Sequence, residues 1–354
     1  MNAADSVLKL VRPDILALTA YSSARKEAQG GRVWLDTNEN PETPSVHRPL
    51  LNRYPEPQPA GLVAQLANLY GVAPAQVLVT RGSDEGIDLI LRTFCRAGQD
   101  AILITPPTYG MYVVAAGIQG ARTLTVPLVR EKNFALDPDA VVRAVTPGLK
   151  VVFLCSPNNP TGNLLERAAV LSLVRLLANR AIVVVDEAYV DFSSQPSLAA
   201  EVAAHPTLVV LRTLSKAYGL AGARVGTTIA NQAIIGVLQK VIAPYPVPAP
   251  VLAAALAALT PAGLAAARES VATLVAERGR LAAALAKLPA VKRVWPSDAN
   301  YLLVEVADST RAMAAGRAVG VVWRDRSKDV PNHIRITIGT AEENNATLEV
   351  LSRE

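Results

Sequence analysis

The chain has 354 residues, a length that favours two domains with a large hydrophobic core. Lys and Arg exceed Asp and Glu by five, and the excess is spread along the chain, so no basic block indicates a nucleic-acid partner. Cys95 and Cys155 lack the spacing of a zinc site or a disulfide scaffold, and the three histidines are isolated. We therefore expect a cytoplasmic protein with reduced thiols and no bound metal.

The N-terminus and one uncharged segment bear on membrane targeting. The first ten residues contain Asp5 and Lys9 and no sustained apolar core, so they do not resemble a secretory signal. Residues 242–267 carry no charge, but five prolines interrupt them and many are alanine. This composition predicts a proline-rich connection followed by a buried helix, and no membrane partner.

From about residue 60, helical stretches alternate with short apolar runs. These runs are residues 77–80, 101–104, 151–155, 182–185 and 208–211. Apolar runs of this length are typical of strands that are buried on both faces. The alternation predicts an α/β domain with a mostly parallel sheet sandwiched by helices, in which ligands bind beyond the carboxyl ends of the strands.

The segment from Pro244 to Pro250 predicts a domain boundary. Beyond it we expect a largely helical stretch over 251–288 with a break at Pro261, followed by strands near 301–304, 321–323 and 334–338. This pattern is typical of a smaller α+β domain. The predicted organisation is an N-terminal arm (1–45) that contributes to the small domain and the substrate site, a large domain (46–245) and a small C-terminal domain (246–354).

The segment from Thr213 to Arg224 carries the clearest chemical signal. Lys216 lies among small residues and hydroxyls just past the run 208–211, and Arg224 follows after a turn-prone Gly/Ala stretch. A lysine amine can form a Schiff base with an aldehyde cofactor, while hydroxyls and an arginine can hold a phosphate dianion. The motif predicts a pyridoxal phosphate enzyme; the alternative is a lysine in a surface loop.

Two further motifs follow predicted strands. Ser83 and Asp84 open an amphipathic helix, whose free backbone N–H groups suit a cofactor phosphate, although such turns are often only helix caps. Asp186 ends an apolar strand, where a carboxylate needs a cationic partner such as a protonated pyridine nitrogen or an arginine. Because carboxyl ends of parallel strands meet at one edge of the sheet, we expect these groups to converge.

Other side chains suit the remainder of the cofactor and the substrate. Tyr189 and Asn159 suit the phenolic oxygen of the cofactor ring, and Tyr109 suits its face or, alternatively, the protein core. Arg335 lies inside an apolar strand and Arg324 follows another apolar run. Both arginines are therefore expected to bind an anion or to pair with a carboxylate.

These motifs resemble those of the fold-type I pyridoxal phosphate aminotransferases, and most closely the histidinol-phosphate aminotransferase family of histidine biosynthesis. The segments that carry the resemblance outside the motifs above are 21–25, 34–41, 53–55 and 334–340. The resemblance runs nearly end to end. It implies transamination of L-histidinol phosphate with 2-oxoglutarate, giving imidazole-acetol phosphate and L-glutamate, in a homodimer with shared active sites.

The resemblance also implies roles for individual residues. Lys216 forms the internal aldimine and shuttles the proton, and the other implied catalytic residues are Asp186 and Tyr189. The residues implied to bind the cofactor phosphate are Ser83, Asp84, Thr213, Ser215 and Arg224, with Tyr54 of the partner subunit. Those implied to bind its ring are Tyr109, Asn159, Asp186 and Tyr189. Those implied to contact the substrate are Tyr21, Asn40, Arg324 and Arg335.

Other functions of the same fold remain open at this point. An aromatic or imidazole amino-acid aminotransferase and a threonine-phosphate decarboxylase would use the same cofactor residues. An effector-sensing module of a transcription regulator would carry an additional DNA-binding segment, and no helix-turn-helix precedes the first core motif.

Overall fold

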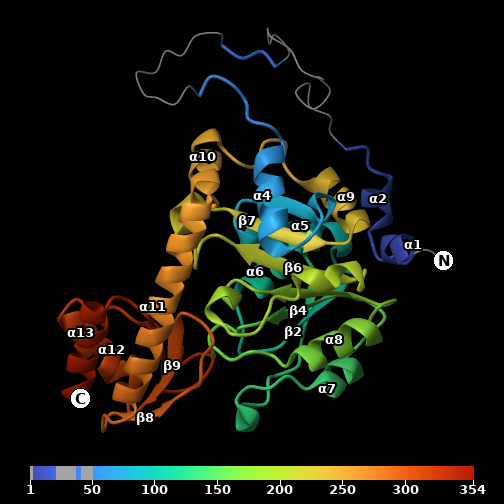
Figure 1. The fold of residues 1–354 in the computed structure, drawn as a ribbon. Coiled ribbons are helices and arrows are strands. Elements are labelled where there is room, and N and C mark those ends of the chain that lie inside the picture. The colour runs from blue at the N-terminus through green and yellow to red at the C-terminus, as the bar shows by residue number, and fades with distance from the viewer. Residues whose placement is uncertain (1–2, 21–36, 41–50) are drawn as a thin grey trace.

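The computed structural model describes residues 3–20, 37–40 and 51–354, and a seven-stranded sheet forms the centre of its larger part (Figure 1). The strand order is β1-β7-β6-β5-β4-β2-β3. The strands are β1 (Val77–Thr80), β2 (Ala101–Ile104), β3 (Arg122–Thr125), β4 (Leu149–Cys155), β5 (Ile182–Asp186), β6 (Leu208–Thr213) and β7 (Gly226–Ala230). Strands β3, β2, β4, β5 and β6 pair in parallel, and β7 is antiparallel to both of its neighbours. The predicted mostly parallel sheet is confirmed.

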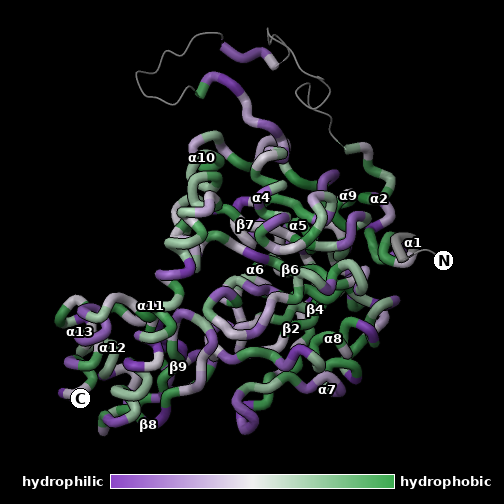
Figure 2. The backbone as a smooth tube through the Cα atoms, in the orientation of Figure 1, coloured by the Kyte–Doolittle hydropathy of each residue, from purple (hydrophilic) through white to green (hydrophobic). Residues whose placement is uncertain are grey.

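All five predicted apolar runs fall on strands, whereas β3 and β7 were not predicted. Strand β3 is an edge strand with partly exposed side chains, so its sequence Arg-Thr-Leu-Thr shows no apolar run. Strand β7 is fully buried but contains two threonines and begins with Gly226. The strands of the central sheet are largely hydrophobic (Figure 2). Strands β3 and β7 lack a continuous apolar run, which is the signal that predicted the other strands.

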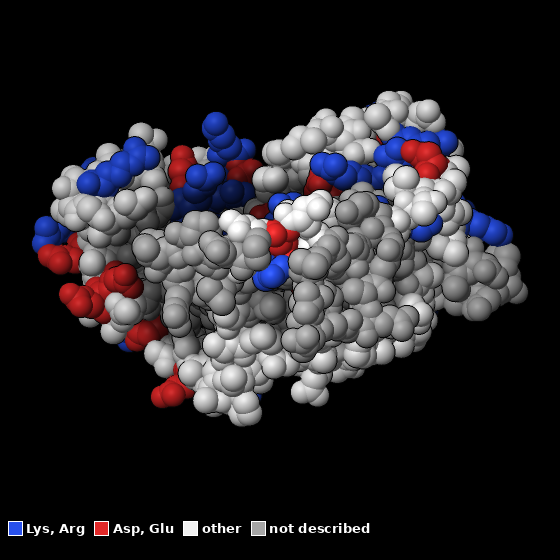
Figure 3. Space-filling view, turned by 90° about the horizontal axis from the view of Figure 1, so that it is seen from above, with Lys and Arg blue, Asp and Glu red and all other residues white. Residues whose placement is uncertain are grey.

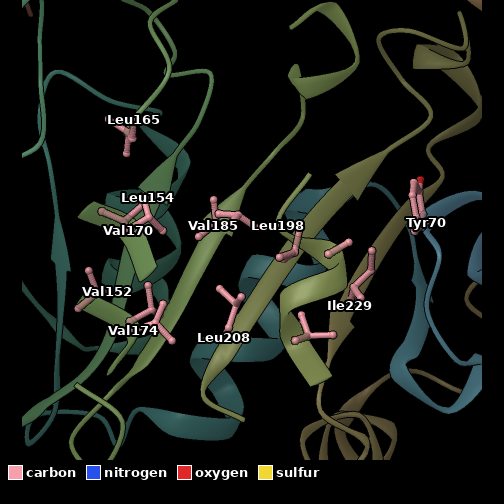
Figure 4. Packing of buried hydrophobic residues seen from close by; sticks show 14 of the residues in the cluster. Tyr70, Val152, Leu154, Leu165, Val170, Val174, Val185, Leu198, Leu208 and Ile229 are labelled. Carbon is pink, nitrogen blue, oxygen red and sulfur yellow. The ribbon is translucent and has the colours of Figure 1, made fainter. Parts of the chain in front are cut away.

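Helices cover both faces of the sheet because its strands alternate their apolar side chains between two core clusters. On β4, Val152 and Leu154 join the cluster under α8, whereas Val151 and Phe153 join the opposite one. Figure 4 shows the first cluster, in which Leu154 packs near Val170. The helices of this domain are α4 (Ala60–Tyr70), α5 (Ser83–Phe94), α6 (Met111–Gln119), α7 (Pro138–Arg143), α8 (Arg167–Leu176) and α9 (Gln232–Val241).

The first residues pack on the large domain rather than on the small one. Helices α1 (Ala3–Leu8) and α2 (Pro13–Ala17) contact α9, and Val7, Leu10 and Val11 are buried in the α9 cluster. This differs from the predicted arm over 1–45, because these apolar side chains complete the large-domain core. The rest of the predicted arm lies outside the described residues except for 12–20 and 37–40.

The C-terminal part forms the predicted α+β unit. Its four-stranded antiparallel sheet has the order β10-β11-β9-β8 and packs against α11, α12 and α13. These elements are β8 (Val291–Val294), β9 (Tyr301–Val306), α12 (Ser309–Ala318), β10 (Arg324–Asp325), β11 (His333–Thr337) and α13 (Ala341–Ser352). The strand predicted at 321–323 was wrong: Val322 is 79% exposed, and Trp323 is buried, with its Nε1–H donating to Thr347 Oγ1 at 3.2 Å. His333 is fully buried on β11.

The proline-rich segment leads into two helices, α10 (Ala249–Ala258) and α11 (Pro261–Leu285), and the break predicted at Pro261 is present as a 72° bend. Helix α10 contacts α4, and Ala255 and Leu259 are buried in the large-domain core. Although α10 lies within the predicted small domain (246–354), its packing therefore belongs to the large domain. Within the described residues no single helix is long and apolar enough to cross a membrane, while this bent pair passes by length and composition alone.

Hydrogen bonds connect the two units next to the sheet edge. The Tyr301 hydroxyl on β9 donates to the carbonyl of Asn158 at 2.7 Å. Arg278 on α11 donates to the carbonyls of Phe192 at 3.3 Å and Ala299 at 2.8 Å. These bonds hold the small antiparallel sheet beside the carboxyl ends of β4 and β5.

The buried cluster in Figure 4 predicts a large cost for truncating Leu154. Leu154→Ala should lower the free energy of unfolding by about 2–5 kcal/mol, because a fully buried side chain leaves a cavity. Leu176→Ala on α8 is the matched control: this leucine is 55% exposed, so its loss should be under about 1 kcal/mol. Denaturant titrations of both variants check this. Equal losses in the two variants would contradict the assigned packing.

Candidate functional site

A cavity of about 540 Å³ lies at the carboxyl ends of the parallel strands, beside the small domain. The predicted site residues that line it are Ser83, Asp84, Tyr109, Asn159, Asp186, Tyr189, Thr213, Ser215, Lys216, Arg224, Arg324 and Arg335. Side chains far apart in the sequence thus meet in one place. Figure 3 shows Lys and Arg side chains gathered in the recess between the two parts of the molecule.

Asp186 is a buried carboxylate at the end of the central strand β5, with an exposed fraction of 3%. The Tyr112 hydroxyl donates to Oδ2 at 2.8 Å, and the Ala188 N–H donates to Oδ1 at 3.1 Å. No Lys, Arg or His of the described residues forms an ion pair with it, and burial raises its pKa to about 6. A protonated pyridine nitrogen would supply the missing positive charge.

Tyr112 was not predicted as a site residue. Its ring is fully buried on α6 and stacks on Phe153 with centroids 4.7 Å apart. A buried tyrosine hydroxyl needs a hydrogen-bond partner, and that partner here is Asp186. The sequence contains one usable signal, since Tyr112 follows Tyr109 by three residues and α6 follows a predicted strand.

Lys216 follows β6 and points its amine toward the same carboxylate region. Its side chain is exposed to the cavity, and Nζ lies 5.7 Å from the centroid of the Tyr189 ring. Partial burial of the amine lowers its pKa, and the positive charges of Arg335 and Arg224 lower it further. A lower pKa increases the fraction of neutral amine, which is the nucleophilic form.

Tyr189, Asn159 and Arg335 form a hydrogen-bonded chain across the two domains. The Asn159 amide donates to the Tyr189 hydroxyl at 3.4 Å, and Arg335 Nη1 donates to Asn159 Oδ1 at 2.6 Å. Arg335 also lies over the ring of Tyr301, and its buried Nε has no hydrogen-bond partner in the part of the chain that the structure describes. Burial raises the pKa of Tyr189, so its hydroxyl keeps its proton and can donate to an acceptor.

The start of α5 and the loop after β6 form a cradle suited to an anion. Gly82 has φ 76°, and a Cβ there would lie 2.5 Å from Arg224 Nη2. Gly226 on β7 is required as well, since a Cβ there would overlap the Gly82 backbone. The free N–H groups of the α5 start therefore face Arg224, whose Nη1 donates to Ser215 Oγ at 3.2 Å.

Thr213 and Asp84 hold this cradle together. The Thr213 hydroxyl donates to Ser215 Oγ at 2.9 Å. The Asp84 carboxylate accepts from the Tyr109 hydroxyl at 3.0 Å and from Arg224 Nη2 at 3.3 Å. A carboxylate repels a phosphate, so the Asp84 side chain orients Tyr109 and Arg224, and only its backbone N–H suits an anion.

Two predicted site residues do not line the cavity, and a third lies outside the described residues. Tyr54 is 51% exposed and stacks on Tyr245 with centroids 4.6 Å apart, outside the cavity lining; its predicted role is in the site of a partner subunit. Asn40 accepts at its carbonyl from Asn52 Nδ2 at 3.0 Å and does not line the cavity. Tyr21 lies outside the described residues.

The cavity also contains residues without a predicted role. Cys155, expected in the core, is buried at the cavity wall, and burial raises the pKa of its thiol, so it stays protonated. Arg326 lines the cavity close to Arg324 and Arg335. It was missed because it follows no apolar run and stands among charged residues.

Comparison with known proteins gives consistent matches along the chain. Residues 32–351 match the family aminotransferase class I and II. Histidinol-phosphate aminotransferase of Stenotrophomonas maltophilia is 49% identical, over 99% of this chain and 98% of that protein. Histidinol-phosphate aminotransferase 1 of Pasteurella multocida is 48% identical, over 98% and 99%. The structure of histidinol-phosphate aminotransferase from Sinorhizobium meliloti with pyridoxal 5'-phosphate has a TM-score of 0.75 and 25% identity, and covers 86% of this chain and 83% of that chain.

The raised pKa of Asp186 predicts a pH-dependent effect of Asp186→Asn in the cofactor-free protein. The folded carboxyl keeps its proton up to a pKa of about 6, against 3.8 for an ordinary aspartate. The folded state thus binds more protons in this window, and stability falls as the pH rises through it. Asp186→Asn should raise the free energy of unfolding by about 3 kcal/mol above about pH 7 and leave it nearly unchanged below about pH 3.

Denaturant titrations across this pH range measure the effect, with exposed Asp139→Asn as the matched control. The same Asp186→Asn change should weaken binding of pyridoxal phosphate, since the charge partner of the ring nitrogen is lost. If the free energies of unfolding of wild type and Asp186→Asn differed by the same amount at every pH, the burial of a destabilising charge at Asp186 would be contradicted.

Proposed function

Because the chain belongs to the aminotransferase class I and II family and is a pyridoxal phosphate-dependent aminotransferase, we propose that it transfers the amino group of L-histidinol phosphate to 2-oxoglutarate, in histidine biosynthesis. The products are imidazole-acetol phosphate and L-glutamate. The observation that carries the proposal is the position of Lys216 between a buried carboxylate and a group of arginines in one cavity. The relatives named for this reaction match the chain over nearly its full length.

The residues present fit the cofactor. Asp186 has no cationic partner in the described part of the chain, and the glycine-lined cradle at α5 would be filled by any side chain at Gly82 or Gly226. When bound, pyridoxal phosphate supplies an electron sink for the negative charge that develops at the substrate carbon. We assign its phosphate to the α5 start with Ser83, Thr213, Ser215 and Arg224. We assign its ring to Asn159, Tyr189 and Tyr109.

Each protein group then has a defined task. The Asp186 carboxylate would hold a proton at the ring nitrogen, and Tyr112 fixes the orientation of that carboxylate. Lys216 Nζ would hold the cofactor and, as a neutral amine, would accept the proton that leaves the substrate carbon and later give it back. The lowered pKa of Lys216 suits this work, because the amine must be neutral to accept the proton.

The arginines favour an anionic substrate. Arg335 and Arg324 face each other across β10 and β11 and both line the cavity. We assign the substrate phosphate to them and, in the second half-reaction, the distal carboxylate of glutamate or 2-oxoglutarate, since guanidinium groups bind both anions. Tyr21 and Asn40 are proposed to complete the substrate site. The side chain of an aromatic amino acid is uncharged and offers no distal anion to these arginines, so the aromatic aminotransferase is disfavoured.

We further propose a homodimer with shared active sites, in the cytoplasm, without a nucleic-acid or membrane partner. Tyr54 is exposed beside Tyr245, which suits a side chain that completes the phosphate site of a partner subunit. Next to the cavity, α6 exposes Val113, Val114 and Ile118, an apolar face suited to a subunit contact. The two buried free cysteines support a reducing compartment.

The proposed role of Lys216 predicts the behaviour of Lys216→Ala. The variant should lose turnover of histidinol phosphate with 2-oxoglutarate by at least about a thousandfold, because no other described group lies in place of the amine. It should still bind pyridoxal phosphate, but only non-covalently. Steady-state assays of both proteins with histidinol phosphate, phenylalanine and threonine phosphate measure the loss and the preference. Normal turnover by the variant would refute the assignment of Lys216, and a wild-type preference for another amine would refute the substrate.

A mixing experiment tests the shared sites. In a dimer of Lys216→Ala chains both sites lack the lysine, and in a dimer of Tyr54→Ala chains both sites lack the tyrosine. Coexpressed in equal amounts, they should form mixed dimers in which one of two sites has both native groups, giving about a quarter of the wild-type activity. Activity equal to the mean of the two separate variants would contradict the role of Tyr54 in the partner subunit.

A further inference from the structure

Three arginines of the small domain line the same side of the cavity. Arg324 lies on β10, directly opposite Arg335 on β11. Arg326 follows two residues later, and its backbone N–H donates to the carbonyl of His333 at 2.9 Å. Residues two apart on an extended segment share a face, which places all three guanidinium groups at the cavity. Only Arg324 and Arg335 have an assigned role so far.

Arg326 is held in place but has unused hydrogen-bonding capacity. Its side chain is 15% exposed, and Nη2 forms an ion pair with Asp329 Oδ2 at 2.8 Å. Its Nε is buried and has no partner among the described residues. Arg324, Arg326 and Arg335 line one cavity; burial lowers the pKa of Arg326, Asp329 opposes this shift, and the charges of Arg335 and Arg324 lower the pKa further. Such a cluster is unfavourable until an anion joins it.

The cavity contains more positive charge than is needed to bind the carboxylate of a substrate. Among the described residues, five cationic side chains and two carboxylates line it. The cations are Lys216, Arg224, Arg324, Arg326 and Arg335, and the carboxylates are Asp84 and Asp186. With Arg224 assigned to the cofactor phosphate, three arginines remain for the substrate. One arginine can satisfy both oxygens of a carboxylate, whereas a phosphomonoester dianion presents three oxygens and nearly twice the charge.

We propose that Arg326 is a specificity-determining residue that binds the phosphate dianion of the amino donor and contributes much less to binding of the dicarboxylate substrates. The inference rests on the proposed function, in which one cavity accepts a phosphomonoester amine in one half-reaction and glutamate in the other. Arg324 and Arg335 serve both substrates, and Arg326 completes the site for the more highly charged one.

The test compares Arg326→Gln with the wild-type holoenzyme in both directions of the reaction. For the variant, KM for histidinol phosphate should rise on the order of tenfold, with a smaller change in kcat, because the lost contact is present before and during the chemical step. The increase in KM for glutamate should be at least about fivefold smaller. Equal losses for the two substrates would overturn the proposal.

Two further variants separate this role from general charge and from folding. Arg317→Gln removes an exposed arginine of α12 outside the cavity, and it should change both KM values by less than about twofold. Asp329→Asn breaks the ion pair of Arg326 and retains the guanidinium, so the substrate preference should be kept. If Asp329→Asn raises KM for histidinol phosphate as selectively as Arg326→Gln does, Arg326 serves only the fold of this loop.

A second readout does not depend on the identity of the amine. Inorganic phosphate should inhibit the glutamate half-reaction of the wild-type holoenzyme competitively, and Arg326→Gln should raise its inhibition constant on the order of tenfold. An unchanged inhibition constant would overturn the role of Arg326. Failure of the wild-type enzyme to use histidinol phosphate, with the phosphate effect intact, would instead refute the proposed substrate alone.

Discussion

The site depends on a buried carboxylate that forms no ion pair with any of the described residues. Asp186 lies at the end of the central strand, where hydrogen bonds from Tyr112 and Ala188 fix its orientation but do not neutralise it. Burial raises its pKa, so the protein alone holds this charge at a cost. A ligand with a protonated ring nitrogen would remove that cost. Burial of Asp186 thus lowers the stability of the ligand-free protein and raises its affinity for such a ligand, whose ring proton the carboxylate would hold. The other groups of the cavity are arranged around this carboxylate.

Positive charge is distributed over two ends of the same cavity. Arg224, with the start of α5, forms one proposed anion site, and the arginines of β10 and β11 form the other. Lys216 lines the same cavity, where partial burial lowers the pKa of its amine and the charges of Arg335 and Arg224 lower it further. The proposed arrangement would bind two anions and also increases the neutral fraction of the nucleophile. The hydrogen bonds of Tyr301 and Arg278 to the large domain matter because they hold the second proposed anion site beside the first.

The sequence predicted the sheet and most of the cavity because both follow from local patterns. Strands buried on both faces are continuous apolar runs, and polar residues at their ends meet at one edge of a parallel sheet. The polar strands β3 and β7 carry no such run. Tyr112 became a site residue only through its contact with Asp186, which is 74 positions away. Arg326 depends on the register of β10 and β11, and the Asp84 carboxylate turned out to hold Tyr109 and Arg224. Contacts between residues so far apart cannot be predicted from a short stretch of sequence.

The measurement that tests the account most directly is the visible absorbance of the bound cofactor during the two half-reactions. Purified holoenzyme is mixed with L-histidinol phosphate alone, and 2-oxoglutarate is added afterwards. We expect histidinol phosphate to remove the visible band of the cofactor and 2-oxoglutarate to restore it, because the amino group would move onto the cofactor and then off it. A band that ignores histidinol phosphate but responds to another amine would contradict the proposed substrate. A protein that shows no band even when pyridoxal phosphate is supplied would contradict the role of Lys216.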